Sequence, residues 1–193
     1  MDRTGEFYAL LFRSKNINRW GMMRNMFPEN LSSHSWETAV LSHALALIGN
    51  KHFSKCYNVE RLVLFALYHD VSEILTGDLP TPVKYYNDDI KIAYKRIEEK
   101  AEEKILSLLS QEYRVDFERL LTLSEEEHKI VKSADKLCAY IKCLDELSAS
   151  NKEFVKAEKT IKESLDDSDC EEAKYFVKNY LKAFEKPLDD ITL

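Results

Sequence analysis

The chain has 193 residues, of which 45% are hydrophobic and 32% are charged, with only four glycines and four prolines. This scarcity of turn residues excludes collagen-like and low-complexity sequences, and it argues against an all-β sandwich, which needs a turn every ~8–12 residues. The formal net charge of −6 argues against a protein that coats polymeric nucleic acid, because such a protein replaces phosphate counterions with a basic surface. We expect one mostly helical domain over residues 1–193.

The N-terminal segment and the cysteines indicate the compartment. The apolar run from Phe7 to Phe12 is too short for the core of a signal peptide or for a membrane span. No two cysteines form a Cys-x-x-Cys pair, so we expect four buried thiols in a reducing compartment. The sequence therefore predicts a cytoplasmic protein that does not bind membranes. The cysteines are Cys56, Cys138, Cys143 and Cys170.

A broad apolar stripe at helical spacing predicts a first long helix over about residues 33–49. Ser32 or Ser33 can cap its start, and Gly49-Asn50 is typical of a helix end. His43 lies on the same apolar stripe, so we interpret it as a core histidine, with a supporting role beside a functional site as the alternative.

A second helix is predicted to begin at Asn58 and to continue through an apolar seam until Gly77, which suits the left-handed position that closes a helix. Residues 78–82 then form a rigid, proline-containing loop. Thr81-Pro82 is a favourable start for the next helix, which is expected to include Lys91–Leu109.

A capping box over Ser124–Glu127 predicts the start of a further long helix, whose seam runs from Ile130 to Leu144. The charged tail after Asn151 is expected to hold one or two more helices. Together the patterns predict an all-α bundle of six to eight helices.

Charged residues on apolar seams are the informative exceptions, because local rules fail most often at functional sites. His34, Asp70 and Asp135 each interrupt or flank an apolar stripe, and a buried carboxylate without a partner costs several kcal/mol. His69 adjoins Asp70, and Glu73 follows one turn later, so the three can converge. Any one of these residues alone is more often a satisfied polar group than a ligand.

Taken jointly, two imidazoles and two carboxylates form a ligand set that suits a divalent first-row metal. Four protein ligands on an octahedral ion leave positions for water and substrate, as hydrolytic catalysis requires. The predicted ligands are His34, His69, Asp70 and Asp135.

Five segments carry a resemblance to known proteins: Arg19–Asn25, Ser33–Ser35, Tyr68–Glu73, Leu75–Tyr85 and Ala134–Tyr140. They resemble the HD-domain phosphohydrolase superfamily and, within it, the bacterial 5′-deoxynucleotidases of the YfbR type. The combination of Arg-Trp with the Gly-Asp-Leu-Pro-Thr-Pro loop is specific, whereas a His-Asp pair alone is not. The resemblance covers about residues 8–155, and the tail at 156–193 is expected to be helical.

The resemblance implies an all-α, homodimeric enzyme that removes the 5′-phosphate from deoxyribonucleoside monophosphates. It implies one divalent metal, such as cobalt or manganese, held by the four predicted ligands. Glu73 would orient or deprotonate the attacking water, with a supporting contact to His69 as the alternative. Arg19 would clamp the phosphate, because its planar guanidinium matches phosphate oxygens. Asp78 would protonate the leaving 5′ oxygen or bind the sugar.

The resemblance also implies a substrate pocket built by residues that flank these groups. Trp20 is our candidate for a wall against the 2′ carbon of the sugar, although a plain core aromatic is the alternative interpretation. The full set of predicted substrate-binding residues is Arg19, Trp20, His34, Asp78, Leu79, Pro80 and Thr81.

Two other classes of function compete with this interpretation. Another HD phosphohydrolase could act on cyclic nucleotides, nucleoside triphosphates or alarmones, although triphosphates call for more basic groups than Arg19, Arg24 and Lys84 provide. A non-catalytic HD module that binds a nucleotide is the second, and the loss of a ligand, of Glu73 or of Arg19 would favour it. Release of phosphate from a panel of monophosphates discriminates among the three.

Overall fold

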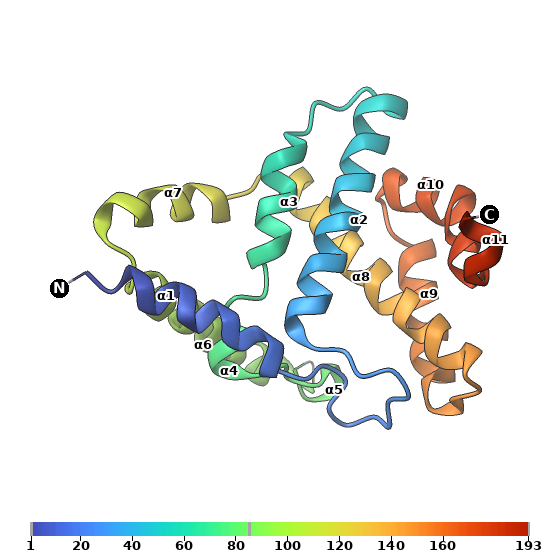
Figure 1. Cartoon of the computed structure of the whole chain (residues 1–193), viewed down its shortest axis with the longest axis horizontal. Coiled ribbons are helices and arrows are strands. Elements are labelled where there is room, and N and C mark those ends of the chain that lie inside the picture. The colour runs from blue at the N-terminus through green and yellow to red at the C-terminus, as the bar shows by residue number, and fades with distance from the viewer. Residues whose placement is uncertain (1, 85, 193) are drawn as a thin grey trace. The chain divides into compact units, whose positions relative to one another are not determined.

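The computed structural model describes residues 2–84 and 86–192, so Tyr85, the last residue of one resembling segment, lies outside the described residues. Within them the regular structure is helical (Figure 1), and the predicted all-α class is confirmed. None of the described helices is long and apolar enough to cross a membrane. The α-helices are α1 (Thr4–Leu11), α2 (Leu31–His52), α3 (Val59–Tyr68), α4 (Glu73–Thr76), α5 (Thr81–Lys84), α6 (Asp88–Leu106), α7 (Gln111–Leu121), α8 (Glu125–Ser148), α9 (Val155–Asp166), α10 (Glu171–Asn179) and α11 (Leu188–Thr192).

The chain forms two compact units, each built from several segments that alternate along the sequence. The first unit contains the chain up to Arg24 together with Pro28–Ser35 and Tyr68–Thr122. The second contains Asn25–Phe27, Trp36–Leu67 and the chain from Leu123 onward. The assignment of residues 1–193 to a single domain stays a prediction.

The first unit has a small apolar core where α1, the turn after α3 and the end of α6 meet. Phe7 is 1% exposed and contacts the edge of the Phe117 ring at a centroid distance of 4.9 Å. Val71 and Ile105 are buried in the same cluster, and Figure 1 shows α1 lying along α6. This packing fixes the residues that follow α3, which carry the polar groups of interest.

The helix that the sequence predicts from Asn58 to Gly77 is broken in the structure. Asn58 caps α3 as predicted, since its side chain accepts the backbone N–H of Arg61 at 3.0 Å. However, α3 ends at Tyr68, and i→i+3 bonds from Val71 to Tyr68 and from Glu73 to Asp70 form a tight turn before α4. His69 and Asp70 therefore lie in a turn, and the prediction that they lie on a helix was wrong.

The segment after this turn differs in a similar way. Gly77 has a φ of 74°, which confirms the predicted positive φ that favours glycine at this position. The predicted single helix through Lys91–Leu109 is instead α5, which begins at Thr81, followed by a separate α6. Asn87 caps α6, because its side chain accepts the backbone N–H of Ile90 at 2.8 Å.

The second unit is organised by α8. The predicted capping box is confirmed: Ser124 accepts the backbone N–H of Glu127, and the Glu127 side chain accepts the backbone N–H of Ser124. Along the seam, Ile130 and Leu137 are fully buried. In the tail, α9 packs on α8 through a 2.9 Å hydrogen bond from the Tyr140 hydroxyl to the Glu158 carboxylate.

Both ends of α2 differ from the prediction. The cap is Asn30 rather than Ser32 or Ser33, because the Asn30 side chain accepts the backbone N–H of Ser33 at 3.0 Å. The helix continues through Gly49 to His52. Gly49 is a close-packing residue here, since a Cβ at this position would meet a ring carbon of Tyr57 at 2.5 Å.

Two buried side chains predicted from the sequence are exposed in the structure. His43 is exposed, as are Trp36 (63%) and Val40 (47%) on the same face of α2. The prediction of a core histidine was therefore wrong, because apolar spacing alone does not show which face of a helix is covered. Cys56 is also exposed, whereas the other three cysteines are buried as predicted.

Glu146 near the end of α8 forms a buried polar network in the second unit. Its carboxylate is fully buried and accepts the backbone N–H groups of Met26 at 2.9 Å and Phe27 at 3.0 Å. Lys142 donates both to this carboxylate and to the Phe27 carbonyl, and Asn151 donates at 2.7 Å. The network fixes the position of residues 26–27, because each of these donors bonds to an acceptor that is buried away from water.

We predict that Glu146→Gln lowers the free energy of unfolding by about 3–5 kcal/mol at neutral pH, because it leaves the Lys142 ammonium buried without a counter-charge. Although burial opposes ionisation of Glu146, its hydrogen bonds, above all that from Lys142, lower its pKa from 4.5 to about 2. The folded-state pKa lies below the unfolded one, so the stability from this charge is complete above pH 4.5 and is lost as the pH falls toward 2.

Urea unfolding at a series of pH values measures both effects. The difference between wild type and Glu146→Gln is expected to shrink on acidification through that window. Asp166→Asn is the matched control, because Asp166 also pairs with a lysine at i,i+4 but is 54% exposed, and exposed pairs contribute less than about 1 kcal/mol. Equal losses in the two variants would contradict the prediction.

Candidate active site

The residues before α2 are held as a short antiparallel pair within the first unit. Asn18 and Asn30 form an isolated β-bridge. The backbone N–H of Arg19 donates to the Glu29 carbonyl at 3.0 Å, and that of Leu31 donates to the Ile17 carbonyl at 2.9 Å. This pairing places the Arg19 and Trp20 side chains beside the first turn of α2, which carries His34.

Three of the predicted metal ligands converge. One ligand atom from each of His34, His69 and Asp70 lies within 4.8 Å of the others. The Asp70 oxygen Oδ2 lies 3.0 Å from His69 Nε2 and 3.7 Å from His34 Nε2. His34 is fully buried, and the Asp70 side chain is 23% exposed, so the cluster faces solvent through its carboxylate.

The electrostatic surroundings keep Asp70 ionised. Burial disfavours the charge, but the neighbouring rings of His69 and His34 and the Arg19 guanidinium outweigh it and hold the pKa of Asp70 well below its usual range. Arg19 Nη1 lies 3.7 Å from Asp70 Oδ2. A permanent negative charge thus stands between two imidazoles.

Glu73 opens α4 and is buried, with 6% of its surface exposed. Burial, together with the Asp70 and Asp78 carboxylates, raises the pKa of Glu73 to about 8. Its Oε2 atom is buried and has no hydrogen-bond partner among the described residues. Native structures rarely leave such an atom unsatisfied without a functional reason, so this oxygen is suited to accept a hydrogen bond from a bound molecule.

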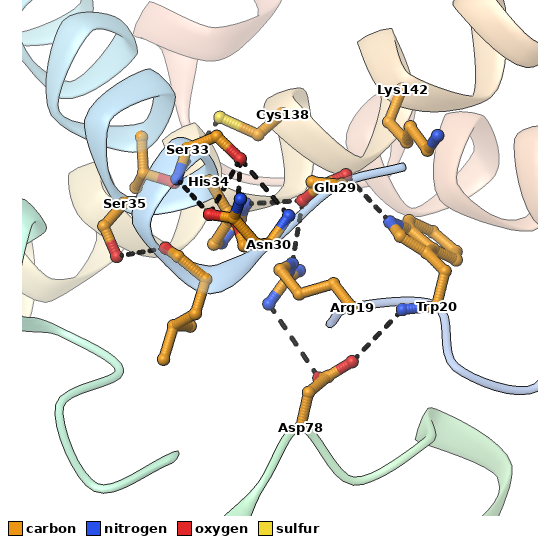
Figure 2. Close-up of polar contacts among 12 residues, drawn as sticks. Arg19, Trp20, Glu29, Asn30, Ser33, His34, Ser35, Asp78, Cys138 and Lys142 are labelled. Atoms are coloured by element: carbon orange, nitrogen blue, oxygen red, sulfur yellow. Dashed lines mark hydrogen bonds and ion pairs between the residues drawn. The ribbon is translucent and has the colours of Figure 1, made fainter. Parts of the chain in front are cut away.

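Arg19 and Glu29 form a second charged group next to the histidines (Figure 2). The Nε of Arg19 donates to Glu29 Oε1 at 2.8 Å, while Nη1 lies 3.9 Å from Asp78 Oδ1. Burial opposes the charge on Glu29, but His34, Arg19 and Trp20 outweigh it and lower the pKa of Glu29. Arg19 therefore links the carboxylates on either side of it.

Trp20 adopts a backbone conformation that is unusual for a bulky residue. Its φ is 58°, in the left-handed region that costs an L-residue about 1–2 kcal/mol. Two hydrogen bonds offset this strain: the backbone N–H donates to Asp78 Oδ2 at 3.3 Å, and the indole N–H donates to Glu29 Oε2 at 3.0 Å. Figure 2 shows Trp20 held between these two carboxylates.

The remaining predicted site residues lie in two places. Leu79 and Pro80 are half-buried in the segment after Asp78, and Thr81 is exposed at the start of α5. Asp135 lies on α8, in the second unit. Its role as a fourth ligand stays a prediction.

Glu29 is the polar residue of this region that the sequence analysis missed. A single glutamate in a loop before a helix resembles a solvated residue in sequence, and its spacing from Arg19 and Trp20 follows no helical or strand period. The only signal in the sequence is its position five residues before His34. The contacts emerge when the bridge between Asn18 and Asn30 brings the two segments together.

The donor set fits a divalent cation. Two imidazole nitrogens and a carboxylate oxygen are ligands that zinc, manganese and cobalt accept, and a cation would further stabilise the charge of Asp70. Beside this set stand a buried carboxylate, Glu73, and a guanidinium, Arg19. The arrangement can hold a metal, activate a water molecule and bind an anion within one unit.

Comparison with known proteins agrees with this chemistry. Residues 6–184 match the family model described as "5′-deoxynucleotidase YfbR-like". A 5′-deoxynucleotidase of Vibrio parahaemolyticus is 49% identical over 193 residues, which cover 98% of this chain and all of that protein. A 5′-deoxynucleotidase of Vibrio vulnificus is 50% identical over 189 residues, covering 96% and 97% of the two chains.

Solved structures share the fold at lower identity. An HD-domain phosphohydrolase from Listeria innocua has a TM-score of 0.82 at 22% identity and covers 94% of this chain and 89% of its own. The HD phosphohydrolase of cyanophage S-2L, solved with dA and one catalytic Zn²⁺ ion, has a TM-score of 0.62 at 22% identity, covering 91% and 96%. The match to the family model over most of the chain, together with the near-50% identity to curated relatives, shows that this protein belongs to the YfbR-like 5′-deoxynucleotidase family.

Proposed function

We propose that this protein hydrolyses deoxyribonucleoside 5′-monophosphates to deoxyribonucleosides and inorganic phosphate. The observation that carries the proposal is the convergence of two imidazoles, a carboxylate and a guanidinium around Asp70, in a member of this family. That combination binds a metal and a phosphate monoester at adjacent positions. The overall acidity of the chain is no obstacle, because one dication and Arg19 supply the positive charge locally.

His34, His69 and Asp70 hold the metal in this proposal, and Asp135 is retained as a fourth ligand from the family resemblance. A divalent ion bound there supplies positive charge for the developing phosphate charge and lowers the pKa of a bound water. Manganese and cobalt are our candidates, since the ligand types accept both.

Glu73, in its ionised form, accepts the proton of the attacking water in this mechanism, and the positive charge of a bound dication would favour that form despite the raised pKa. Its buried Oε2 atom has no hydrogen-bond partner among the described residues, so it is available to orient the water toward the phosphorus. The P–O5′ bond breaks as the new P–O bond forms, and the leaving 5′ oxygen takes up a proton. Arg19 binds the phosphate oxygens through its terminal nitrogens, because its Nε is engaged by Glu29.

Asp78 and Trp20 face the sugar in the proposed complex. Asp78 has two candidate roles, which are protonation of the leaving oxygen and binding of the sugar. Trp20 is the proposed wall against the 2′ carbon, because a ribonucleotide would leave a desolvated hydroxyl there at a cost of about 1–3 kcal/mol. Leu79, Pro80 and Thr81 complete this side of the proposed pocket.

Monophosphates fit the basic residues of the first unit better than triphosphates do. Lys84 donates to Glu98 at 2.7 Å and lies over the Tyr94 ring at 5.1 Å. It is therefore engaged on the α6 side, and Arg19 is the basic residue that contacts Asp70 and Asp78. One guanidinium and one dication match a single phosphate group.

We further propose that the protein is a cytoplasmic homodimer, as the family resemblance implies. In support of the location, none of the four cysteines forms a disulfide among the described residues. In support of the dimer, Trp36 is 63% exposed and Val40, one turn along the same face of α2, is 47% exposed. A second copy of the chain covering this face would remove that apolar surface from water.

We predict that the purified protein releases phosphate from deoxyribonucleoside 5′-monophosphates when Mn²⁺ or Co²⁺ is added and not when a chelator is present. A panel of deoxyribonucleotides and ribonucleotides, including cyclic nucleotides, triphosphates and alarmones, measures the activity. Turnover restricted to cyclic nucleotides, triphosphates or alarmones would instead indicate an HD phosphohydrolase that acts on that class of substrate. Absence of metal-dependent release from every deoxyribonucleoside monophosphate would refute the proposal.

We predict that Asp70→Ala weakens Co²⁺ binding by at least about tenfold, because it removes the anionic ligand between His34 and His69. Isothermal titration calorimetry of the metal-depleted protein measures the affinity without substrate. Asp116→Ala is the control, since Asp116 is 76% exposed on α7. Unchanged affinity in Asp70→Ala would contradict the assignment of the ligands.

We predict that Trp36→Lys shifts the protein from dimer toward monomer, because it places a charge in the proposed apolar interface. Analytical ultracentrifugation measures the mass of each form. Ile92→Lys is the control, since Ile92 is 53% exposed on α6 and lies outside the proposed surface. A monomeric wild type, or a dimer that Trp36→Lys leaves intact, would argue against this surface.

A further inference from the structure

Glu29 lies in the loop before α2, and the mechanism above gives it no part beyond its bond to Arg19 Nε. The residue is 9% exposed. A buried carboxylate is costly unless donors surround it, so its presence beside the candidate active site calls for an explanation. Its neighbours supply one.

Two residues of the site donate N–H groups to this one carboxylate, and the ring of a third, His34, lies against it. Oε1 accepts from Arg19 Nε at 2.8 Å and lies 3.3 Å from His34 Nδ1. Oε2 accepts from the Trp20 indole nitrogen at 3.0 Å. Figure 2 shows the three side chains reaching Glu29 from two segments of the chain. Each belongs to a different part of the proposed mechanism: metal binding, phosphate binding and sugar selection.

We propose that Glu29 is a positioning residue whose carboxylate sets the orientation of His34, Arg19 and Trp20 together. The inference rests on the proposed function. It adds one residue that orients side chains on the metal, phosphate and sugar sides of the site. It assigns Glu29 no contact with the substrate.

For His34, the carboxylate sets which nitrogen carries the proton. An acceptor beside Nδ1 favours a proton on that nitrogen, which leaves Nε2 as the lone-pair atom. Nε2 is the nitrogen that lies 3.7 Å from Asp70 Oδ2. Glu29 thus presents His34 in the form that binds a cation shared with Asp70.

For Arg19, the carboxylate fixes the plane of the guanidinium. A bond to Nε leaves the two terminal nitrogens on the far side, and Nη1 lies 3.7 Å from Asp70 and 3.9 Å from Asp78. The planar group is therefore aimed along a defined direction, which is the property that matches it to phosphate oxygens.

For Trp20, the carboxylate holds the indole of a residue whose backbone is already constrained. The positive φ and the bond to Asp78 fix the backbone, and Glu29 fixes the ring. A wall that discriminates a hydroxyl from a hydrogen must not move, so the indole bond bears directly on selectivity.

Glu29→Gln tests the proposal with little change of shape. Arg19 Nε donates to one oxygen and the Trp20 indole to the other, so the amide NH₂ of glutamine would face a donor at either position. We expect Co²⁺ affinity of the metal-depleted protein, measured by calorimetry, to fall about 10–100-fold. At saturating Co²⁺ we expect KM for deoxyribonucleoside monophosphates to rise, and the deoxy-to-ribo ratio of kcat/KM to fall because the Trp20 indole loses its acceptor.

Two further variants make these readouts decisive. Glu118→Gln is the matched control, because Arg114 Nε donates to Glu118 at 2.7 Å on the exposed surface of α7, and it should change none of the readouts. Glu29→Asp keeps a charged acceptor and should bind Co²⁺ with an affinity between those of wild type and Glu29→Gln. If Glu29→Gln fails to fold, wild-type affinity and wild-type deoxy-to-ribo ratio in Glu29→Asp overturn the proposal.

The metal titration keeps this inference separate from the proposed function. A wild type that hydrolyses no deoxyribonucleotide would refute the function, whereas a loss of Co²⁺ affinity in Glu29→Gln would still support the positioning of His34. A Glu29→Gln protein with a lowered Tm but unchanged Co²⁺ affinity, KM and deoxy-to-ribo ratio shows a purely structural residue and overturns the proposal.

Discussion

One carboxylate oxygen, Asp70 Oδ2, is the point on which the candidate site depends. His69 Nε2 lies 3.0 Å from it, and His34 Nε2 and Arg19 Nη1 each lie 3.7 Å away. These groups come from three separate segments of the first unit, so this single charge gives them a common centre. Its burial is tolerated because cationic and imidazole groups surround it, and the same requirement makes a divalent ion a favourable occupant.

Buried carboxylates organise the rest of the molecule in the same way. Glu29 accepts from Arg19 and Trp20 and lies against the His34 ring in the first unit. Glu146 gathers two backbone N–H groups and a lysine in the second. Both fix parts of the irregular segment before α2, in which Met22, Met26 and Phe27 are exposed and so contribute little apolar packing. Polar groups that must be fully satisfied define one geometry more narrowly than apolar contacts do.

The sequence predicted the helical class, the Asn58 cap and the Ser124 capping box, because these follow from periodicity and local hydrogen bonding. The proximity of His34, His69 and Asp70 was also predictable, since charges on apolar seams stand out. The position of His69 and Asp70 in a turn was not, because the apolar period continues past the break at Tyr68. Glu29 was missed because its partners are distant in sequence or follow no period. His43 shows that amphipathic spacing cannot tell which face is covered.

We propose that His34, His69 and Asp70 hold one divalent ion. The most direct test is an anomalous difference map from crystals grown with Co²⁺ and measured at the cobalt absorption edge. We expect one peak within about 2.0–2.2 Å of a nitrogen of each histidine and an oxygen of Asp70. A map without a peak at these three residues, in crystals whose protein binds Co²⁺ elsewhere, would contradict it.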